Sequence, residues 1–84
     1  MPYTVVVTKK IQKEINRIDK RYRKRITAAL VFLGDDPYMG KKLEGDHKHQ
    51  WSLRVWPYRI VYEIEKNKLI VLIVKIAHRQ GVYK

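Results

Sequence analysis

Apolar residues follow two different rhythms along this chain. Between residues 9 and 33 they recur every three or four positions, at Ile11, Ile15, Ile18, Tyr22, Ile26, Leu30 and Leu33. This spacing places them along one face of a helix. Because Asp19 and Lys20 interrupt the pattern, we expect two helices, at residues 9–18 and 21–33, that form an antiparallel hairpin. Thr8 is the expected N-cap of the first helix, and Gly34 is the expected stop of the second.

The remaining segments have the patterns of β-strands. Residues 3–8 are rich in β-branched side chains, residues 51–55 and 58–64 alternate between apolar and polar, and residues 69–74 are apolar throughout. Turn-forming residues crowd positions 34–50, which we expect to be a surface loop. The order β-α-α-β-β-β predicts an α+β fold, in which the helical hairpin packs on one face of a mainly antiparallel four-stranded sheet. No repeat or linker divides the chain, so we expect a single domain over residues 1–84.

Two tight turns would set the register of the last three strands. A turn at residues 56–57 places Arg54 directly opposite Arg59. A turn at residues 66–67 places Arg59 opposite Val74. Like charges that face each other across strands are destabilising, so an exposed arginine pair is best explained by a bound anion.

These registers also divide the sheet into two faces. The expected core face carries Trp51, Leu53, Val55, Tyr58, Ile60, Tyr62, Ile64, Leu69, Val71 and Ile73. The other face has the two arginines at one end and an apolar strip along the last strand, formed by Ile70, Leu72 and Val74. Because no part of the sequence obviously covers this strip, it suits an amphipathic, acidic segment of a partner protein.

In this register the chain leaves the last strand at the arginine end of the sheet. The side chains expected to converge there are Arg54, Arg59, His78, Arg79 and Tyr83. A β-bulge in either hairpin would move one arginine to the other face. Each residue also has a purely structural interpretation: a solvated strand face for the arginines, a surface polar residue for His78 and a terminal packing anchor for Tyr83.

Composition narrows the possible partners. The chain has 19 Lys or Arg against 8 Asp or Glu, a net charge of +11, together with 45% apolar residues. A folded polycation of this kind attracts nucleic acid first, then acidic protein segments or anionic membranes. With no Cys, with His47 and His49 in a loop and with His78 isolated, no metal site or cofactor is expected. The longest apolar run, residues 69–74, is too short to cross a bilayer, and we expect a cytoplasmic protein.

The basic residues divide between a candidate site and candidate docking surfaces. RNA carries its own nucleophile in the 2′-hydroxyl, so its cleavage needs only positioning, proton transfer and cations for the phosphate, which Arg, Tyr and His supply. Further basic residues either are solvated or contact nucleic-acid phosphates: Arg21, Arg23, Lys24 and Arg25 in the second helix, and Lys41 and Lys42 in the loop. Trp51 and Trp56 are interpreted as core and turn anchors rather than as surfaces on which bases stack.

Four segments carry a family resemblance: G-K-K-L-E-G at 40–45, W-S-L-R-V at 51–55, Y-R-I-V-Y-E-I at 58–64 and A-H-R-Q-G-V-Y at 77–83. In this order they resemble the RelE branch of the RelE/ParE toxin superfamily. The resemblance implies a ribosome-dependent mRNA endoribonuclease that acts in the A site and is neutralised by an acidic, RelB-like antitoxin. It assigns catalytic positions to Arg54, Arg59, Arg79 and Tyr83. Well-known members carry a proton-transferring Lys where this chain has Ser52, and His78 is our candidate for that role.

Two other functions stay open. The ParE branch of the same superfamily inhibits DNA gyrase without a nuclease site, although it generally lacks the C-terminal Arg and Tyr. A third possibility is a relative that binds RNA but has lost catalysis, which Ser52 favours.

Overall fold

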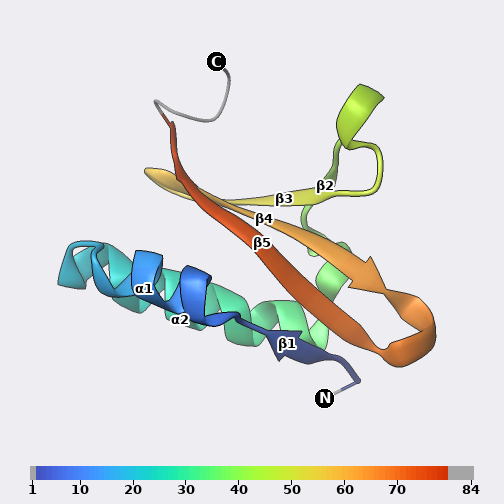
Figure 1. Cartoon of the computed structure of the whole chain (residues 1–84), viewed down its shortest axis with the longest axis horizontal. Helices are drawn as coiled ribbons and strands as arrows, with labels where there is room; N and C mark the ends of the chain where they lie inside the picture. The colour runs from blue at the N-terminus through green and yellow to red at the C-terminus, as the bar shows by residue number, and fades with distance from the viewer. Residues whose placement is uncertain (1, 80–84) are drawn as a thin grey trace.

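Two helices cover one face of a curved five-stranded sheet in this computed structural model, which describes residues 2–79 (Figure 1). The elements are β1 Thr4–Val6, α1 Lys9–Asn16, α2 Lys20–Asp35, β2 Lys41–Lys42, β3 Trp51–Val55, β4 Tyr58–Glu65 and β5 Ile70–His78, with 3₁₀ turns at Pro37–Met39, Gly45–His47 and Lys66–Lys68. The predicted α+β class is confirmed, and so is the predicted order of helices and strands apart from the additional strand β2.

The two helix starts follow the sequence. The Thr8 hydroxyl accepts a hydrogen bond from the Ile11 N–H at 3.3 Å, and the Asp19 carboxylate accepts one from the Arg21 N–H at 2.9 Å. Each side chain therefore satisfies a backbone donor that the first helical turn leaves unpaired. The predicted stop at Gly34 is wrong, because α2 continues to Asp35. Gly34 is buried, and its carbonyl accepts a hydrogen bond from the Tyr3 N–H at 3.1 Å, which ties β1 to the helix end.

The sheet has one more strand than predicted. Its order is β1-β5-β4-β3-β2, with β1 parallel to β5 and the other neighbours antiparallel. The extra strand, β2, comes from the segment expected to be a surface loop, and it pairs with the edge of β3. Two residues are too few to show an alternating pattern, so sequence periodicity could not reveal this strand.

Tyr62 holds the segment before β2 in place. Its hydroxyl, buried in the core, donates a hydrogen bond to the Pro37 carbonyl at 2.7 Å. Burial raises the pKa of Tyr62 to about 12, although the backbone of Gly40 opposes this shift. A Cβ at Gly40 would collide with the Tyr62 hydroxyl and with the carbonyl oxygen of Ser52, so only glycine fits where the chain enters β2.

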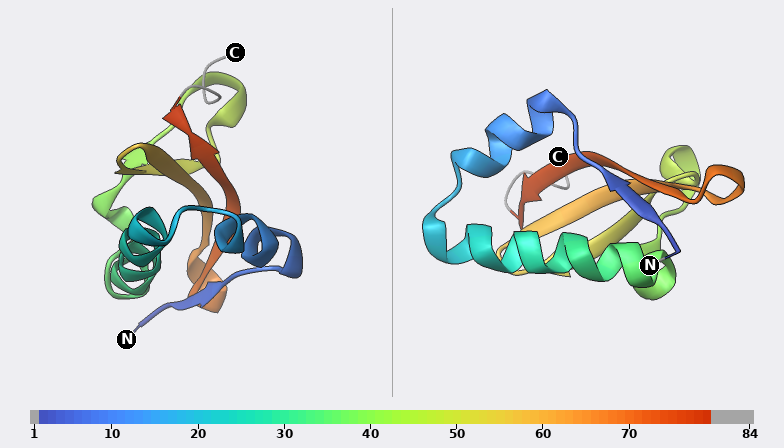
Figure 2. Two further views of the ribbon diagram at one scale, coloured as in Figure 1. Left: turned by 90° about the vertical axis from the view of Figure 1, so that its left-hand side faces the viewer. Right: turned by 90° about the horizontal axis from the view of Figure 1, so that it is seen from below.

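The core lies between the helices and the sheet. Figure 2 shows α1 and α2 side by side across this face, running in opposite directions as predicted. The buried residues of the core are Ile11, Ile15, Ile26 and Leu33 from the helices and Ile60, Tyr62, Val71, Ile73 and Ile76 from the sheet. The helical members all belong to the predicted apolar face. Leu69, predicted to lie in the core, is exposed in the turn before β5, with a left-handed backbone (φ 53°).

One of the two predicted registers is correct. Arg54 lies opposite Arg59 across a two-residue turn, as predicted. The second is wrong: Arg59 pairs with Ala77, not with Val74. The β4–β5 turn is wider than expected, because Glu65 pairs with Ile70. The pairing also shifts between Val61 and Tyr62, where a bulge leaves Val74 without a partner in the register. This bulge changes which β5 side chains share a face with Arg59.

Candidate functional site

Arg54 and Arg59 meet on the sheet face that the helices do not cover. They are direct cross-strand neighbours on β3 and β4. Both line a hollow of about 440 Å³, whose other lining residues are Met39, Gly40, Lys41, Leu43, Ser52 and Leu53. Two guanidinium groups in an open hollow form a site for an anion, because each presents several N–H donors to phosphate oxygens.

Ser52 positions one of these arginines. It is only 4% exposed, and its hydroxyl accepts a hydrogen bond from the Arg59 guanidinium at 3.3 Å. The residue at which the chain departs from the family pattern therefore has a structural role. It fixes the direction of Arg59 within the hollow, and sequence reasoning did not foresee this contact.

Lys41 faces Ser52 across the β2–β3 pair. Cross-strand partners share a face, and Lys41 accordingly lines the same hollow as the two arginines. Lys42 instead pairs with Trp51, so it lies on the other face of the sheet edge. The prediction that both lysines belong to a surface loop is therefore wrong, because both belong to a strand, and only Lys41 joins the arginines.

Arg79 extends the site beyond the end of β5. Its backbone N–H donates to the Pro57 carbonyl at 2.7 Å, and its guanidinium lies 4.7 Å from the centre of the Trp56 ring. A second hollow, of about 220 Å³, is lined by Arg54, Trp56, Pro57, Tyr58, Arg59 and Arg79. Because both arginines of the first hollow line this one as well, the two hollows adjoin. The predicted convergence of Arg54, Arg59 and Arg79 is confirmed.

His78 does not share this face. It pairs with Tyr58, and the two rings make an edge-to-face contact with centroids 5.2 Å apart. The side chains of Tyr58 and Arg59 point to opposite faces because they are consecutive in a strand. The predicted register, which put His78 on the face of Arg59, is thus wrong, since the bulge shifts β5 by an odd number of residues and reverses its faces. Because Tyr58 lines the smaller hollow, His78 still lies next to the site, and its part in the chemistry stays a prediction. The other predicted member, Tyr83, lies outside the described residues.

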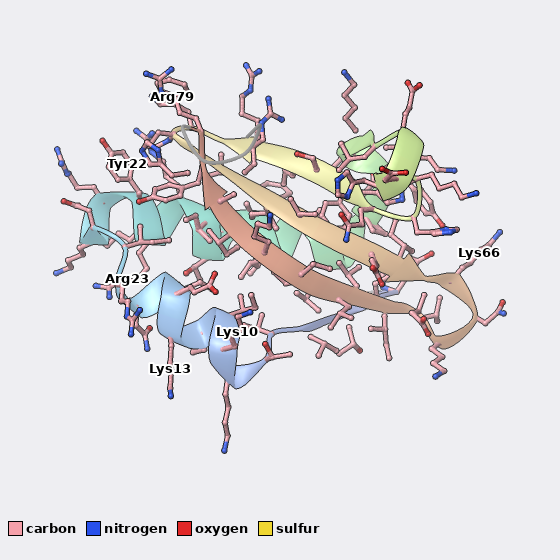
Figure 3. All side chains as sticks on the ribbon, turned by 45° about the horizontal axis from the view of Figure 1, so that its top comes forward. Lys10, Lys13, Tyr22, Arg23, Lys66 and Arg79 are labelled. Atoms are coloured by element: carbon pink, nitrogen blue, oxygen red, sulfur yellow. The ribbon has the colours of Figure 1, made fainter. Side chains whose placement is uncertain are left out.

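The basic run in α2 divides into two groups. The guanidinium groups of Arg21 and Arg25 lie 5.3 and 6.0 Å from the Tyr22 ring centre, and Tyr22 in turn contacts Tyr58. Figure 3 shows Tyr22 and Arg79 at the same end of the molecule. The carboxylate of Asp19, whose pKa is lowered by its hydrogen bonds with Arg21, lies at this end of α2 as well.

The other two basic residues of this run point elsewhere. Arg23 and Lys24, with Lys20 and Thr27, line a separate hollow of about 340 Å³ along α2. Arg23 also donates to the Asn16 carbonyl at 3.3 Å. In Figure 3 it lies near the α1 side, toward Lys13.

Two residues of the predicted apolar strip on β5, Ile70 and Leu72, lie on the open face of the sheet, whereas Val74 is the residue that the bulge leaves unpaired. Ile70, Leu72 and Val74 are all half-buried, and Glu65 and Glu63 pair with the first two. A second apolar surface was not anticipated. It is a hollow of about 430 Å³ between the edge strand β1 and α2, lined by Tyr3, Thr4, Val5, Val7, Thr27, Leu30 and Val31. Val31, an apolar residue outside the predicted apolar face of α2, is the signal in the sequence, and it is 58% exposed.

The described residues offer neither a metal site nor a membrane-spanning helix. Across positions 2–79, no His, Asp and Glu side chains form a cluster of three that could hold a metal ion. In the same region, no helix combines the length and the apolar character needed to cross a membrane.

With this geometry established, comparison with known proteins identifies the family. The family described as "ParE toxin of type II toxin-antitoxin system, parDE" matches residues 5–83. The chain belongs to the RelE/ParE superfamily of type II toxins. The toxin RelG of Mycobacterium tuberculosis is 31% identical to it, over 100% of this chain and 99% of that protein.

Solved structures place this toxin among RelE-like proteins. The toxin–antitoxin complex RelBE2 of Mycobacterium tuberculosis matches with a TM-score of 0.84 and 26% identity, over 94% of this chain and 100% of that one. The archaeal RelE–RelB complex of Pyrococcus horikoshii matches in fold with a TM-score of 0.83 and 23% identity, over 98% of this chain and 100% of that one. The predicted RelE-like fold is confirmed.

Proposed function

We propose that this RelE-like toxin is a ribosome-dependent endoribonuclease that cleaves mRNA in the A site. The observation that carries the proposal is that Arg54, Arg59 and Arg79 line two adjoining hollows on one open face. Cations gathered around a bound phosphate stabilise the negative charge that develops on it under attack.

The proposed reaction uses the nucleophile of the RNA itself. The 2′-oxygen forms a bond to the adjacent phosphorus, the bond from phosphorus to the 5′-oxygen breaks, and the products are a 2′,3′-cyclic phosphate and a 5′-hydroxyl. One proton leaves the 2′-hydroxyl and one joins the 5′-oxygen. Arg54 holds the scissile phosphate, while Arg59 and Arg79 stabilise the transition state. The ribosome would supply the geometry of the message.

Lys41 is our candidate for proton transfer. Guanidinium groups stay protonated in proteins, so the arginines of the larger hollow do not serve as acid or base. Among the described residues that line this hollow, Lys41 is the one amine, and it faces Ser52, where well-known relatives carry a lysine. Tyr83, which the family resemblance assigns to the site, remains a second candidate. His78, whose ring packs against Tyr58 beside the smaller hollow, is a third candidate.

The helix cations would dock the toxin on ribosomal RNA. Arg21 and Arg25 lie at the same end as the arginine hollows, whereas Arg23 and Lys24 point away along α2. Basic side chains on two sides of one helix suit a site enclosed by RNA, where phosphates approach from more than one direction. Lys42, on the far side of β2, would add to this docking. A ribosomal target implies a cytoplasmic protein.

A cognate acidic antitoxin of the RelB type is the proposed protein partner. The relatives of known structure include RelE–RelB complexes. The β5 strip of Ile70, Leu72 and Val74 remains a candidate surface, although Glu63 and Glu65 beside it make an acidic partner less favourable there. The hollow between β1 and α2 is a second candidate, because β1 lies at one edge of the sheet and can pair with an added strand.

Cleavage of a defined mRNA with and without programmed ribosomes tests the proposal, with the cut ends mapped by primer extension. Cuts that need ribosomes and fall at A-site codons would support it. Cuts in free RNA would contradict the ribosome dependence. Inhibition of DNA gyrase supercoiling with no RNA cleavage would favour the ParE-like alternative, and neither activity would indicate a relative that has lost catalysis.

A further inference from the structure

Trp56 is the most exposed aromatic ring beside the arginine hollows. It lies in the β3–β4 turn and is 55% exposed. Trp51, by contrast, is half-buried and packs edge-to-face on Tyr38. The interpretation of Trp51 as a core anchor is thus supported. Trp56 lies in the turn as expected, but its exposure leaves room for a role in binding. An indole left in water forgoes the stabilisation that burial would give it, so an exposed ring next to a binding site points to a ligand.

The surroundings of Trp56 indicate the class of ligand. The Arg79 guanidinium lies over the ring, 4.7 Å from its centre, so the indole face already stacks with a flat group. The hollow of about 220 Å³ that Trp56 lines also contains the side chains of Arg54 and Arg59. No Asp or Glu is among its lining residues within positions 2–79. An aromatic face next to several cations is the combination by which proteins bind unpaired nucleotides.

We propose that Trp56 is the platform on which an unpaired base of the RNA stacks while the neighbouring phosphate lies in the arginine hollows. This deepens and rests on the proposed nuclease function, because it concerns the same site. On binding, the base takes the place of the Arg79 guanidinium on the indole, and the guanidinium turns to a phosphate. Stacking of this kind tolerates every base, since each base has a π-face, so Trp56 would fix the position of the nucleotide rather than its identity.

A peptide is the competing ligand for an aromatic and basic site. The apolar surfaces that suit a docked peptide lie elsewhere, on the β5 strip and between β1 and α2. The lining of the Trp56 hollow offers few aliphatic side chains, since arginines and rings make up most of it. The geometry therefore favours a nucleotide over a peptide at Trp56.

Tryptophan fluorescence separates the two rings. The probe is a short single-stranded RNA with 2′-O-methyl groups throughout, so that the proposed reaction cannot occur, titrated into the purified full chain without ribosomes. Trp51→Phe leaves Trp56 as the one tryptophan, and Trp56→Phe leaves Trp51. We expect the RNA to quench fluorescence in the Trp51→Phe variant and to leave it unchanged in Trp56→Phe. Equal quenching in both variants, or none in either, would overturn the proposal.

Affinity provides the second readout. We expect Trp56→Ala to weaken binding of this RNA about tenfold, and Trp56→Tyr to restore most of it, because stacking survives in a smaller ring. An unchanged melting temperature for Trp56→Ala serves as the folding control. Wild-type affinity in Trp56→Ala would overturn the proposal. Quenching of Trp56 by a poly-glutamate peptide, with affinity equal to that of the RNA, would also overturn it. That result would show that the site binds acidic peptides through their charge.

This design also separates the inference from the nuclease function. Quenching of Trp56 by the methylated RNA, with no cleavage on ribosomes, would support the stacking platform and contradict the nuclease. Cleavage on ribosomes without quenching would support the nuclease and overturn the platform.

Discussion

The Arg59 guanidinium donates a hydrogen bond to the buried hydroxyl of Ser52 at 3.3 Å. This contact joins two neighbouring strands on the face that carries the candidate site. Arg59 also lies directly opposite Arg54, so a group that fixes its direction offsets part of the repulsion between the two cations. Ser52 is therefore a positioning residue, and its effect on function passes through Arg59.

Removal of the Ser52 hydroxyl should slow cleavage without unfolding the protein. A hydrogen bond to a charged group contributes about 1.5–3 kcal/mol, so we expect the rate of mRNA cleavage on ribosomes to fall about tenfold or more in Ser52→Ala. Ser52→Thr keeps a hydroxyl and should retain more activity. The measurement is single-turnover cleavage. A Ser52→Ala variant as fast as wild type would show that the contact has no role in positioning.

The arginines themselves should be needed for the chemical step. We expect Arg59→Ala and Arg79→Ala each to abolish detectable cleavage while ribosome binding survives, because both groups are proposed to act on the transition state. Lys66→Ala, in the β4–β5 turn at the opposite end of the molecule in Figure 3, is the matched control for loss of one cation. Pelleting with ribosomes measures binding separately from cleavage. Full activity in both arginine variants would reject the mechanism.

The positions of Lys41 and Ser52 allow a swap. Since the two residues face each other across β2 and β3, an amine placed at either one enters the same hollow. We expect Lys41→Ala to lose most activity and Lys41→Ala/Ser52→Lys to recover part of it. Lys42→Ala, one residue away but on the other face, should cleave nearly as wild type. Equal losses in Lys41→Ala and Lys42→Ala would indicate a general charge effect instead of proton transfer.

The sequence predicted the local features well and the long-range pairing less well. The cap at Thr8 and the register of Arg54 against Arg59 depend on residues close together in the chain, and the structure confirms both. The β4–β5 register could not be predicted, because β5 is apolar on both faces and alternation therefore does not set its pairing. Because of the resulting bulge, His78 pairs with Tyr58 and does not share a face with Arg59.

The site shows the same division. The position of Arg79 near the arginines was predicted correctly. Arg79 follows the end of β5, where its backbone N–H bonds to Pro57 in the β3–β4 turn. Lys41 was missed as a member because the strand that presents it is two residues long. The exposure of Trp56 was also missed, because composition does not tell a buried ring in a turn from an open one.

Ribosome binding should depend on the cations of α2, and the salt dependence of that binding should reveal their contacts. Each phosphate contact releases counterions, so loss of contacts lowers the salt dependence of binding. We expect Arg23→Ala/Lys24→Ala to weaken ribosome binding and to reduce the slope of log affinity against log salt, with isolated protein stability little changed. Lys66→Ala/Lys68→Ala removes two cations at the far turn and should leave the slope unchanged. Identical slopes in both double variants would show that the α2 side is not a docking surface.

Tyr62 should link the stability of the fold to alkaline pH. Its pKa is raised from 10.0 to about 12 by burial, so the native state keeps the phenol proton more tightly than the unfolded chain does. The neutral hydroxyl thus contributes stability that is fully present below pH 10 and is lost as pH rises toward 12.

At neutral pH, Tyr62→Phe should lower the free energy of unfolding by about 1–2 kcal/mol, because the buried Pro37 carbonyl loses its donor. Above pH 10 the difference between the two proteins should shrink, since the phenylalanine variant has no proton to lose. Urea unfolding at pH 8, 10 and 11 measures this difference, and the other basic and phenolic groups cancel because both proteins share them. A constant difference across this range would show that Tyr62 titrates alike in the folded and unfolded states.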